Sequence, residues 1–160
     1  MRMTLAKALK EKKRLAGRIS ELEQKIQANN VYSKENENCP VKFEKIDIVE
    51  DYNKYVDYHN RIAKMKSIIA QANAENGISL LVYEMEELKS HLSFLKRLNV
   101  NVKPEKEFIG DKMVFFEREA QISYEYVTAT KEDIQKKIEY LQDRIDDLNA
   151  TVTVEFDVVF

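Results

Sequence analysis

The stretch LAKALKEKKRLAGRISELEQKIQAN, residues 5–29, decides the fold class of this 160-residue chain. Its apolar residues recur at alternating steps of three and four, which places them on one stripe of an α-helix. The stripe, with one lysine among its members, consists of Leu5, Ala8, Lys12, Leu15, Ile19, Leu22 and Ile26. Thr4 is expected to cap the helix, because its hydroxyl can accept a hydrogen bond from a first-turn amide. A helix over residues 4–29 is long for a globular protein and therefore predicts a partner helix along its stripe.

The same heptad spacing predicts three further helices, over about 48–73, 79–98 and 130–148. The dipeptide Asn76-Gly77 is a turn signal between the second and third helices, so we expect these two to form an antiparallel hairpin. Thr130 is expected to begin the last helix, with Asp133 at the third helical position in the manner of a capping box.

Alternating apolar and polar residues predict short strands over about 41–44, 121–127 and 151–159. The tail TVTVEFDVVF shows the clearest alternation, and such a strand needs a partner, because an open apolar edge favours aggregation. That partner is either one of the other two strands or the same strand of another subunit. Residues 105–119 fit a helix or a strand equally.

The composition favours a helical protein. Gly contributes 3 residues and Pro 2, which leaves few turns, while 34% of the residues are charged and 44% belong to the hydrophobic set. We therefore predict a mainly α (α+β) fold of long antiparallel helical hairpins, resembling a coiled coil, with a small antiparallel β element that includes the C-terminal strand. One domain over residues 1–160 is expected. The single cysteine, Cys39, and the lack of a membrane-spanning apolar run indicate a cytoplasmic location.

Catalytic signatures are missing from the sequence. It contains no phosphate-binding glycine loop, no HExxH or GxSxG motif and no CxxC pair. His59 and His91 stand apart without metal-ligand spacing, and a structural role on a helix suits both. Glu87 and His91 are four residues apart, but the Glu-x-x-His pairs of bundle di-metal proteins are lacking. The expectation is a protein that is not an enzyme and uses no cofactor or metal.

Positive charge is concentrated at the start of the chain. Residues 1–28 carry eight Lys or Arg and three Glu, hence +5, although the whole chain has a net charge of -2. A helical wheel places most of the cations on one face, together with Glu11 and Glu21. This basic face consists of Lys7, Lys10, Arg14, Arg18 and Lys25. A solvated face is one interpretation; an acidic partner, an anionic small molecule or an anionic membrane surface are the others. Nucleic acid is disfavoured, because no aromatic residues interleave with these cations.

Six residues are the candidates for a ligand site, since they supply cations, amides and stacking rings. They are Arg14, Arg18, Asn29, Asn73, Tyr124 and Tyr126. Such a set suits an anionic metabolite or a signalling nucleotide held between subunits. The tyrosines are also explained by packing, because a ring with a polar tip suits the junction of a sheet and a helix.

The first helix resembles the start of a small bacterial and phage family known as septicolysin-like proteins. The pattern L-A-x-A-L is present, followed by spaced basic residues and leucines and a closing Asn29. Residues 69–73, IAQAN, are similar to the family's I-N-x-T-N, with Ala70 and Ala72 in place of its first Asn and its Thr. The tail, with an Asn149 followed by a Thr-rich strand, also fits. The resemblance implies a helical hairpin fold with a small β element and oligomerisation.

Together these patterns predict a non-enzymatic, homo-oligomeric interaction protein, because its apolar stripes exceed what one chain of this length is expected to bury. One alternative is an oligomeric protein that sequesters an anionic small molecule, as in phage anti-defence. Another is a membrane-active lysin that uses the basic first helix. The sequence leaves open the ligand, the number of subunits and the biological process.

Overall fold

The computed structural model describes residues 1–33, 45–100 and 102–156, and it divides the chain into two compact units. The first unit contains Met1–Asn76 and Asp147–Phe160, and the second contains Gly77–Asp146. Helices dominate both units, as expected from the composition, and short antiparallel strands complete them. The predicted mainly α fold with a small β element is thus confirmed.

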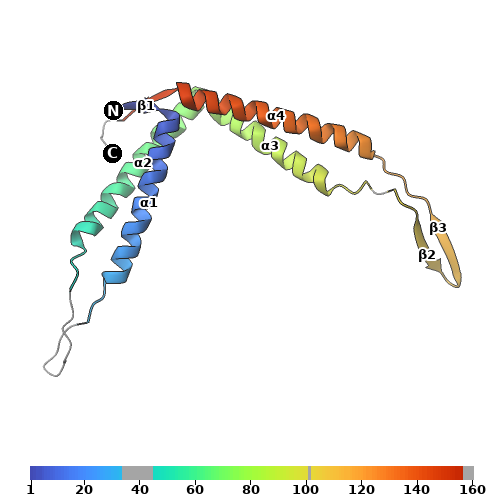
Figure 1. Cartoon of the computed structure of the whole chain (residues 1–160), viewed down its shortest axis with the longest axis horizontal. Coiled ribbons are helices and arrows are strands. Elements are labelled where there is room, and N and C mark those ends of the chain that lie inside the picture. Colours follow the sequence, from blue (N-terminus) through green and yellow to red (C-terminus); the bar gives the residue numbers. More distant parts are fainter. Residues whose placement is uncertain (34–44, 101, 157–160) are drawn as a thin grey trace. The chain divides into compact units, whose positions relative to one another are not determined.

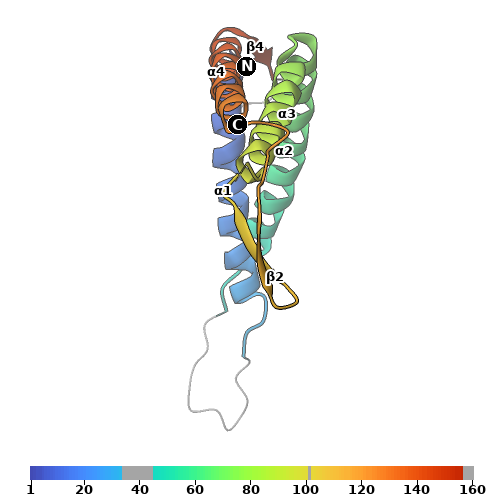
Figure 2. The same ribbon diagram turned by 90° about the vertical axis from the view of Figure 1, so that its right-hand side faces the viewer.

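The first unit is built on two antiparallel helices, α1 (Leu5–Asn29) and α2 (Val49–Glu75), which pack side by side (Figures 1 and 2). Their heptad stripes face each other and form the core of the unit. The buried members are Leu5, Ala8, Leu15, Ile19, Ile62, Met65, Ile69 and Ala72. Lys12, the charged member of the stripe, is only half-buried. The α1–α2 pair therefore follows directly from the spacing of apolar residues.

Local hydrogen bonds define the ends of these helices. The Thr4 hydroxyl accepts from the backbone N–H of Lys7 at 3.3 Å, which confirms the predicted cap. At the start of α2, the Asp47 carboxylate accepts from the N–H of Val49 at 3.0 Å. At its end, the Asn76 side chain donates to the carbonyl of Ala72 at 2.8 Å. Gly77 follows with a φ of 72°, a left-handed conformation that costs glycine little and ends α2 sharply.

The two ends of the chain pair with each other. Strand β1 (Arg2–Thr4) runs antiparallel to β4 (Thr153–Glu155), with Met3 opposite Val154. The N–H of Phe156 donates to the carbonyl of Met1 at 2.9 Å, and the terminal ammonium donates to the carbonyl of Phe156. This pairing corrects the expected partner of the C-terminal strand, which was 121–127, 41–44 or another subunit. Three residues at the N-terminus are too few to show an alternating pattern, so the sequence did not reveal β1 as a strand.

The second unit combines a helix pair with a hairpin. Helices α3 (Ile78–Arg97) and α4 (Tyr124–Thr151) run beside each other (Figure 1) and line the same surface grooves. Strands β2 (Glu105–Ile109) and β3 (Lys112–Phe116) form an antiparallel hairpin around Gly110, whose φ is 64°. Of residues 105–119, which fit a helix or a strand from the sequence, these ten residues are strand and none is helical. The buried positions of the helix pair include Met85, Leu92, Leu95, Ile134, Ile138 and Leu141.

The strand expected over 121–127 is wrong, because α4 begins at Tyr124. The Ser123 hydroxyl accepts from the N–H of Tyr126 at 3.2 Å and so supports the first turn of the helix. Val127 lies seven residues before Ile134 and is 1% exposed, so the apolar stripe of the helix extends back past Thr130. The alternation of apolar and polar residues over 121–127 is short, and the heptad spacing that continues from α4 through Val127 is the stronger pattern.

Within the first unit α2 packs on α1, and within the second α3 runs beside α4. The hairpin expected between residues 48–73 and 79–98 stays a prediction. Periodicity shows which face of a helix is apolar, but not which other stripe covers it. The strand expected at 41–44 and the last residues of the one expected at 151–159 lie outside the described residues.

Phe156→Ala is expected to lower the free energy of unfolding by about 3–5 kcal/mol, because it empties a site where the ring is 1% exposed. Phe94→Ala is the matched control: Phe94 is 51% exposed, so the change should stay within about 0.5 kcal/mol. Urea unfolding followed by circular dichroism measures both. Equal losses for the two variants would contradict the core position of Phe156.

Candidate functional site

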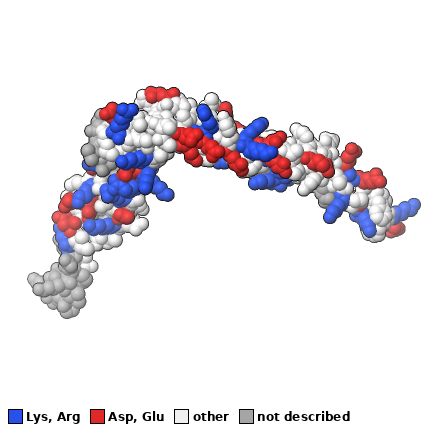
Figure 3. All heavy atoms as spheres, turned by 45° about the horizontal axis from the view of Figure 1, so that its top comes forward, with Lys and Arg blue, Asp and Glu red and all other residues white. Residues whose placement is uncertain are grey.

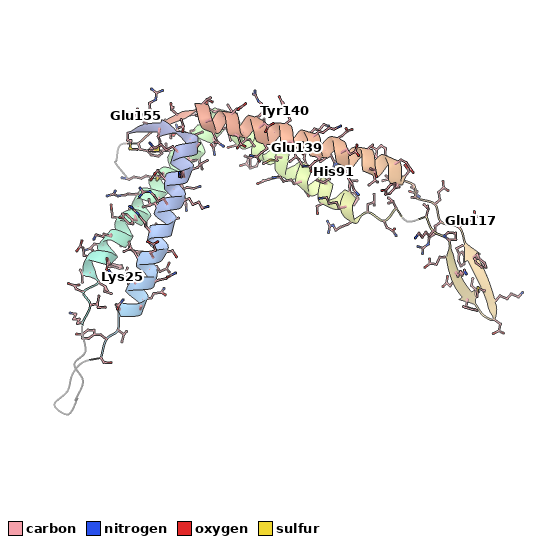
Figure 4. All side chains as sticks on the ribbon, viewed as in Figure 1. Lys25, His91, Glu117, Glu139, Tyr140 and Glu155 are labelled. Carbon is pink, nitrogen blue, oxygen red and sulfur yellow. The ribbon has the colours of Figure 1, made fainter. Side chains whose placement is uncertain are left out.

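A groove of about 750 Å³ lies on the surface of the α3 and α4 pair. We call it the α3–α4 groove. Its α3 wall consists of Leu80, Tyr83, Glu84, Glu87, Leu88 and His91. Its α4 wall consists of Lys137, Tyr140 and Leu141. Figure 4 labels His91 and Tyr140 on these two helices.

Most of the groove surface is apolar, yet several of its side chains are open to solvent. Leu80 is 61% exposed, Tyr83 62% and Tyr140 63%, whereas Leu141 is buried against the helix pair. Leu80, Tyr83 and Glu87 follow one another at steps of three and four, beside the buried stripe of α3 rather than on it. Tyrosine and leucine in this position are typical of a surface that another helix or ligand covers.

The two walls of the groove differ in charge. The α3 wall carries the carboxylates of Glu84 and Glu87, and the α4 wall carries the ammonium of Lys137. No ion pair among the described residues uses these three groups. They are therefore available to groups of opposite charge on a partner.

The six residues proposed from the sequence as a ligand site are divided between the two units, and the four in the first unit are spread along its helices. Arg14 donates to Glu11 at 2.7 Å on the exposed surface of α1, and Arg18 is exposed one turn further along. Asn29 is the last residue of α1, beside the start of the antiparallel α2, and its amide donates to the carbonyl of Lys25 at 2.7 Å. Asn73 lies 24 positions after Val49, about 36 Å along α2 at 1.5 Å per residue, so it is remote from Asn29.

The two tyrosines of that set belong to the second unit. Tyr124 and Tyr126 are each 63% exposed in the first turn of α4, within the second unit. Asn73 has one feature that suits a site: its side-chain oxygen is buried and has no hydrogen-bond partner among the residues that the structure describes. Burying such an oxygen without a partner is costly, but no charged side chain of the predicted set accompanies it.

The basic face of α1 is partly neutralised by neighbouring acids. Arg14 pairs with Glu11 at 2.7 Å, and Lys25, labelled in Figure 4, pairs with Asp51 of α2 at 2.6 Å. Figure 3 shows Asp and Glu side chains interspersed with Lys and Arg on the surface it presents. The face is thus better described as a solvated helix surface with ion pairs than as a concentrated anion site.

The histidines occupy different environments. His59 packs its ring edge-on against Tyr55, with 4.5 Å between the ring centroids, and Tyr55 in turn stacks on Tyr52 at 6.4 Å. His91 lies in the α3–α4 groove. Within residues 1–33, 45–100 and 102–156, no group of three or more His, Cys, Asp or Glu is arranged to hold a metal ion. Cys39 lies outside these ranges.

Comparison of the chain with protein-family models, curated proteins and solved structures found no match. The resemblance to septicolysin-like proteins stays a prediction. Among the described helices, none combines the length and the apolar character needed to cross a membrane.

Sequence reasoning missed the α3–α4 groove as a candidate site. The sequence of α3 predicts a single apolar stripe, which includes Leu81, Leu88 and Leu95. The available signal was a pair of apolar residues beside that stripe, Leu80 and Tyr83, which are three positions apart. A helix with apolar residues on two adjacent faces contacts more than one neighbour.

The Lys25–Asp51 pair joins α1 to α2, so we expect it to couple the two helices energetically. A double-mutant cycle with Lys25→Gln and Asp51→Asn should give a coupling free energy of about 0.5–1 kcal/mol, reduced at high salt. Urea unfolding of the four proteins measures it.

The matched control is the Glu50–Lys54 pair, which links successive turns of α2 alone and has an N–O distance of 2.5 Å. The side-chain hydrogen bond to Glu50 and its charge raise the pKa of Lys54. Because this pair does not join two helices, its cycle should show a smaller coupling. A larger value for Glu50–Lys54 would contradict the role given to Lys25 and Asp51.

Proposed function

We propose that this chain is a non-enzymatic interaction protein that works as a homo-oligomer. The observation that supports this best is the large amount of apolar surface that the second unit leaves uncovered. It occurs on the α3–α4 groove and on the β2–β3 hairpin. Large exposed apolar surfaces on soluble proteins are typically sites of association.

The β2–β3 hairpin has several apolar side chains that are uncovered. Phe108 is 69% exposed, Phe115 62% and Met113 49%. The register pairs Phe108 with Met113 and Lys106 with Phe115, so these four side chains share one face of the hairpin. The ammonium of Lys106 lies 5.2 Å from the centroid of the Phe115 ring. A two-stranded hairpin is marginally stable alone in water, so contact with another surface would stabilise it.

The chemistry of these surfaces favours a protein partner over an anionic small molecule. Tyr, Phe and Met are enriched in protein interfaces, and they provide most of the uncovered area here. The α3–α4 groove has two carboxylates on one wall, which would repel a phosphate group. The separation of Asn29 from Asn73 also argues against a single-chain anion site.

The proposal is tested by the association state of the whole chain. We expect sedimentation velocity at micromolar concentration to show a species of at least twice 18.8 kDa that dissociates on dilution. The unfolding temperature should rise with protein concentration, because association stabilises the folded chain by mass action. A monomer of 18.8 kDa throughout the concentration range would contradict self-association.

A further inference from the structure

We infer that the α3–α4 groove binds the same helix pair of a second copy, with α3 of each chain lying over α4 of the other. The inference rests on the proposed self-association and assigns its surface and arrangement. The product is a four-helix bundle made from two chains.

The first argument is the distribution of apolar side chains. One helix laid on another buries only the seam between them, and α3 and α4 bury theirs with residues such as Met85, Ile138 and Leu141. Leu80, Tyr83 and Tyr140 rise beside that seam and remain exposed. A second helix pair placed on the groove would bury these three side chains, as the inner positions of four-helix bundles are buried.

The second argument is charge complementarity, which selects both the occupant and its orientation. The same groove is lined by Glu84 and Glu87 on one wall and by Lys137 on the other. These three residues therefore lie at similar positions along the axis of the helix pair. A twofold axis parallel to the helices places α3 of one copy over α4 of the other at the same height. Each acidic wall then faces a basic wall, twice in the symmetric dimer.

The alternative pairings are less favourable on the same grounds. Placing α3 over α3 would oppose the carboxylates of the two copies, and like charges in contact disfavour association. The β2–β3 hairpin of a second copy offers an apolar face with Lys106 as its single charge, which leaves Lys137 of the groove without a counter-charge. A second helix pair instead places Lys137 against the carboxylates of one wall and carboxylates against Lys137 of the other.

The decisive experiment mixes two charge-reversed variants. Glu87→Lys alone places lysine against Lys137 in the dimer, and Lys137→Glu alone places glutamate against Glu87. Each variant should therefore associate about tenfold or more weakly than the unmodified chain. In an equimolar mixture, every contact between unlike chains pairs opposite charges, so association should return towards the original strength. An effect confined within one chain cannot be restored by mixing.

Two controls accompany the mixture. Glu86 neighbours Glu87 in sequence but does not line the groove, so Glu86→Lys should leave association unchanged and should not rescue Glu87→Lys. Circular dichroism should show equal helix content for all variants. Because the chain contains no Trp, Tyr140→Trp provides a reporter whose emission should shift to shorter wavelength on association. Tyr124→Trp, at a site equally exposed on α4, should not shift.

The outcomes separate the two proposals. If the unmodified chain is monomeric, self-association fails and this arrangement fails with it. If it associates but the reversed variants behave normally, or the mixture shows no recovery, self-association stands and the groove assignment is overturned. A Tyr140→Trp shift without charge dependence would assign the groove to another occupant, such as the β2–β3 hairpin.

Discussion

The antiparallel pairing of β1 with β4 is the contact on which the first unit depends. It joins Arg2 to Glu155 and Thr4 to Thr153, at opposite ends of the sequence, and aligns the start of α1 with the chain that follows α4. The N–H of Leu5, the first residue of α1, donates to the carbonyl of Val152 at 2.9 Å, so the sheet leads directly into the helix. Met3, Leu5, Val154 and Phe156 are all buried at this junction. The pairing of the two ends of the chain thus also supplies part of the core of the first unit.

Long amphipathic helices explain most of the remaining architecture. A helix pair can bury one stripe of each member and leaves the other faces in water. In α1 and α2 most of the outer surface is charged or polar, although Val49, Tyr52 and Val56 of α2 are also exposed. Lys25–Asp51 adds an ion pair between the helices. In α3 and α4 part of the outer surface is apolar, with Tyr83 and Tyr140 exposed. The same construction therefore leaves a solvated surface in one unit and an associating surface, as we propose, in the other.

The elements that the sequence predicts correctly are those with a long pattern of apolar residues. The predicted bounds of helices α1, α2 and α3 agree with the structure to within a few residues, because each helix carries at least two heptads of apolar stripe. The strand expected at 121–127 failed because its alternation was short, and Val127 continued the stripe of α4 instead. Strand β1 was missed because three residues show no period. Within the first unit, Asn29 and Asn73 lie at opposite ends of the helix pair, because the chemical type of a residue carries no information about its distance from another. The ligand site between subunits stays a prediction.

The amino-acid sequence by itself determined that the chain is mainly helical, where most helices lie and which faces are apolar, since these depend on local spacing and capping. Only the tertiary structure decided which stripes meet, that the chain ends form a sheet, and that Leu80, Tyr83 and Tyr140 stay uncovered. These features depend on contacts between residues distant in sequence. Local periodicity carries no information about such pairings, because any apolar stripe can be buried by any other.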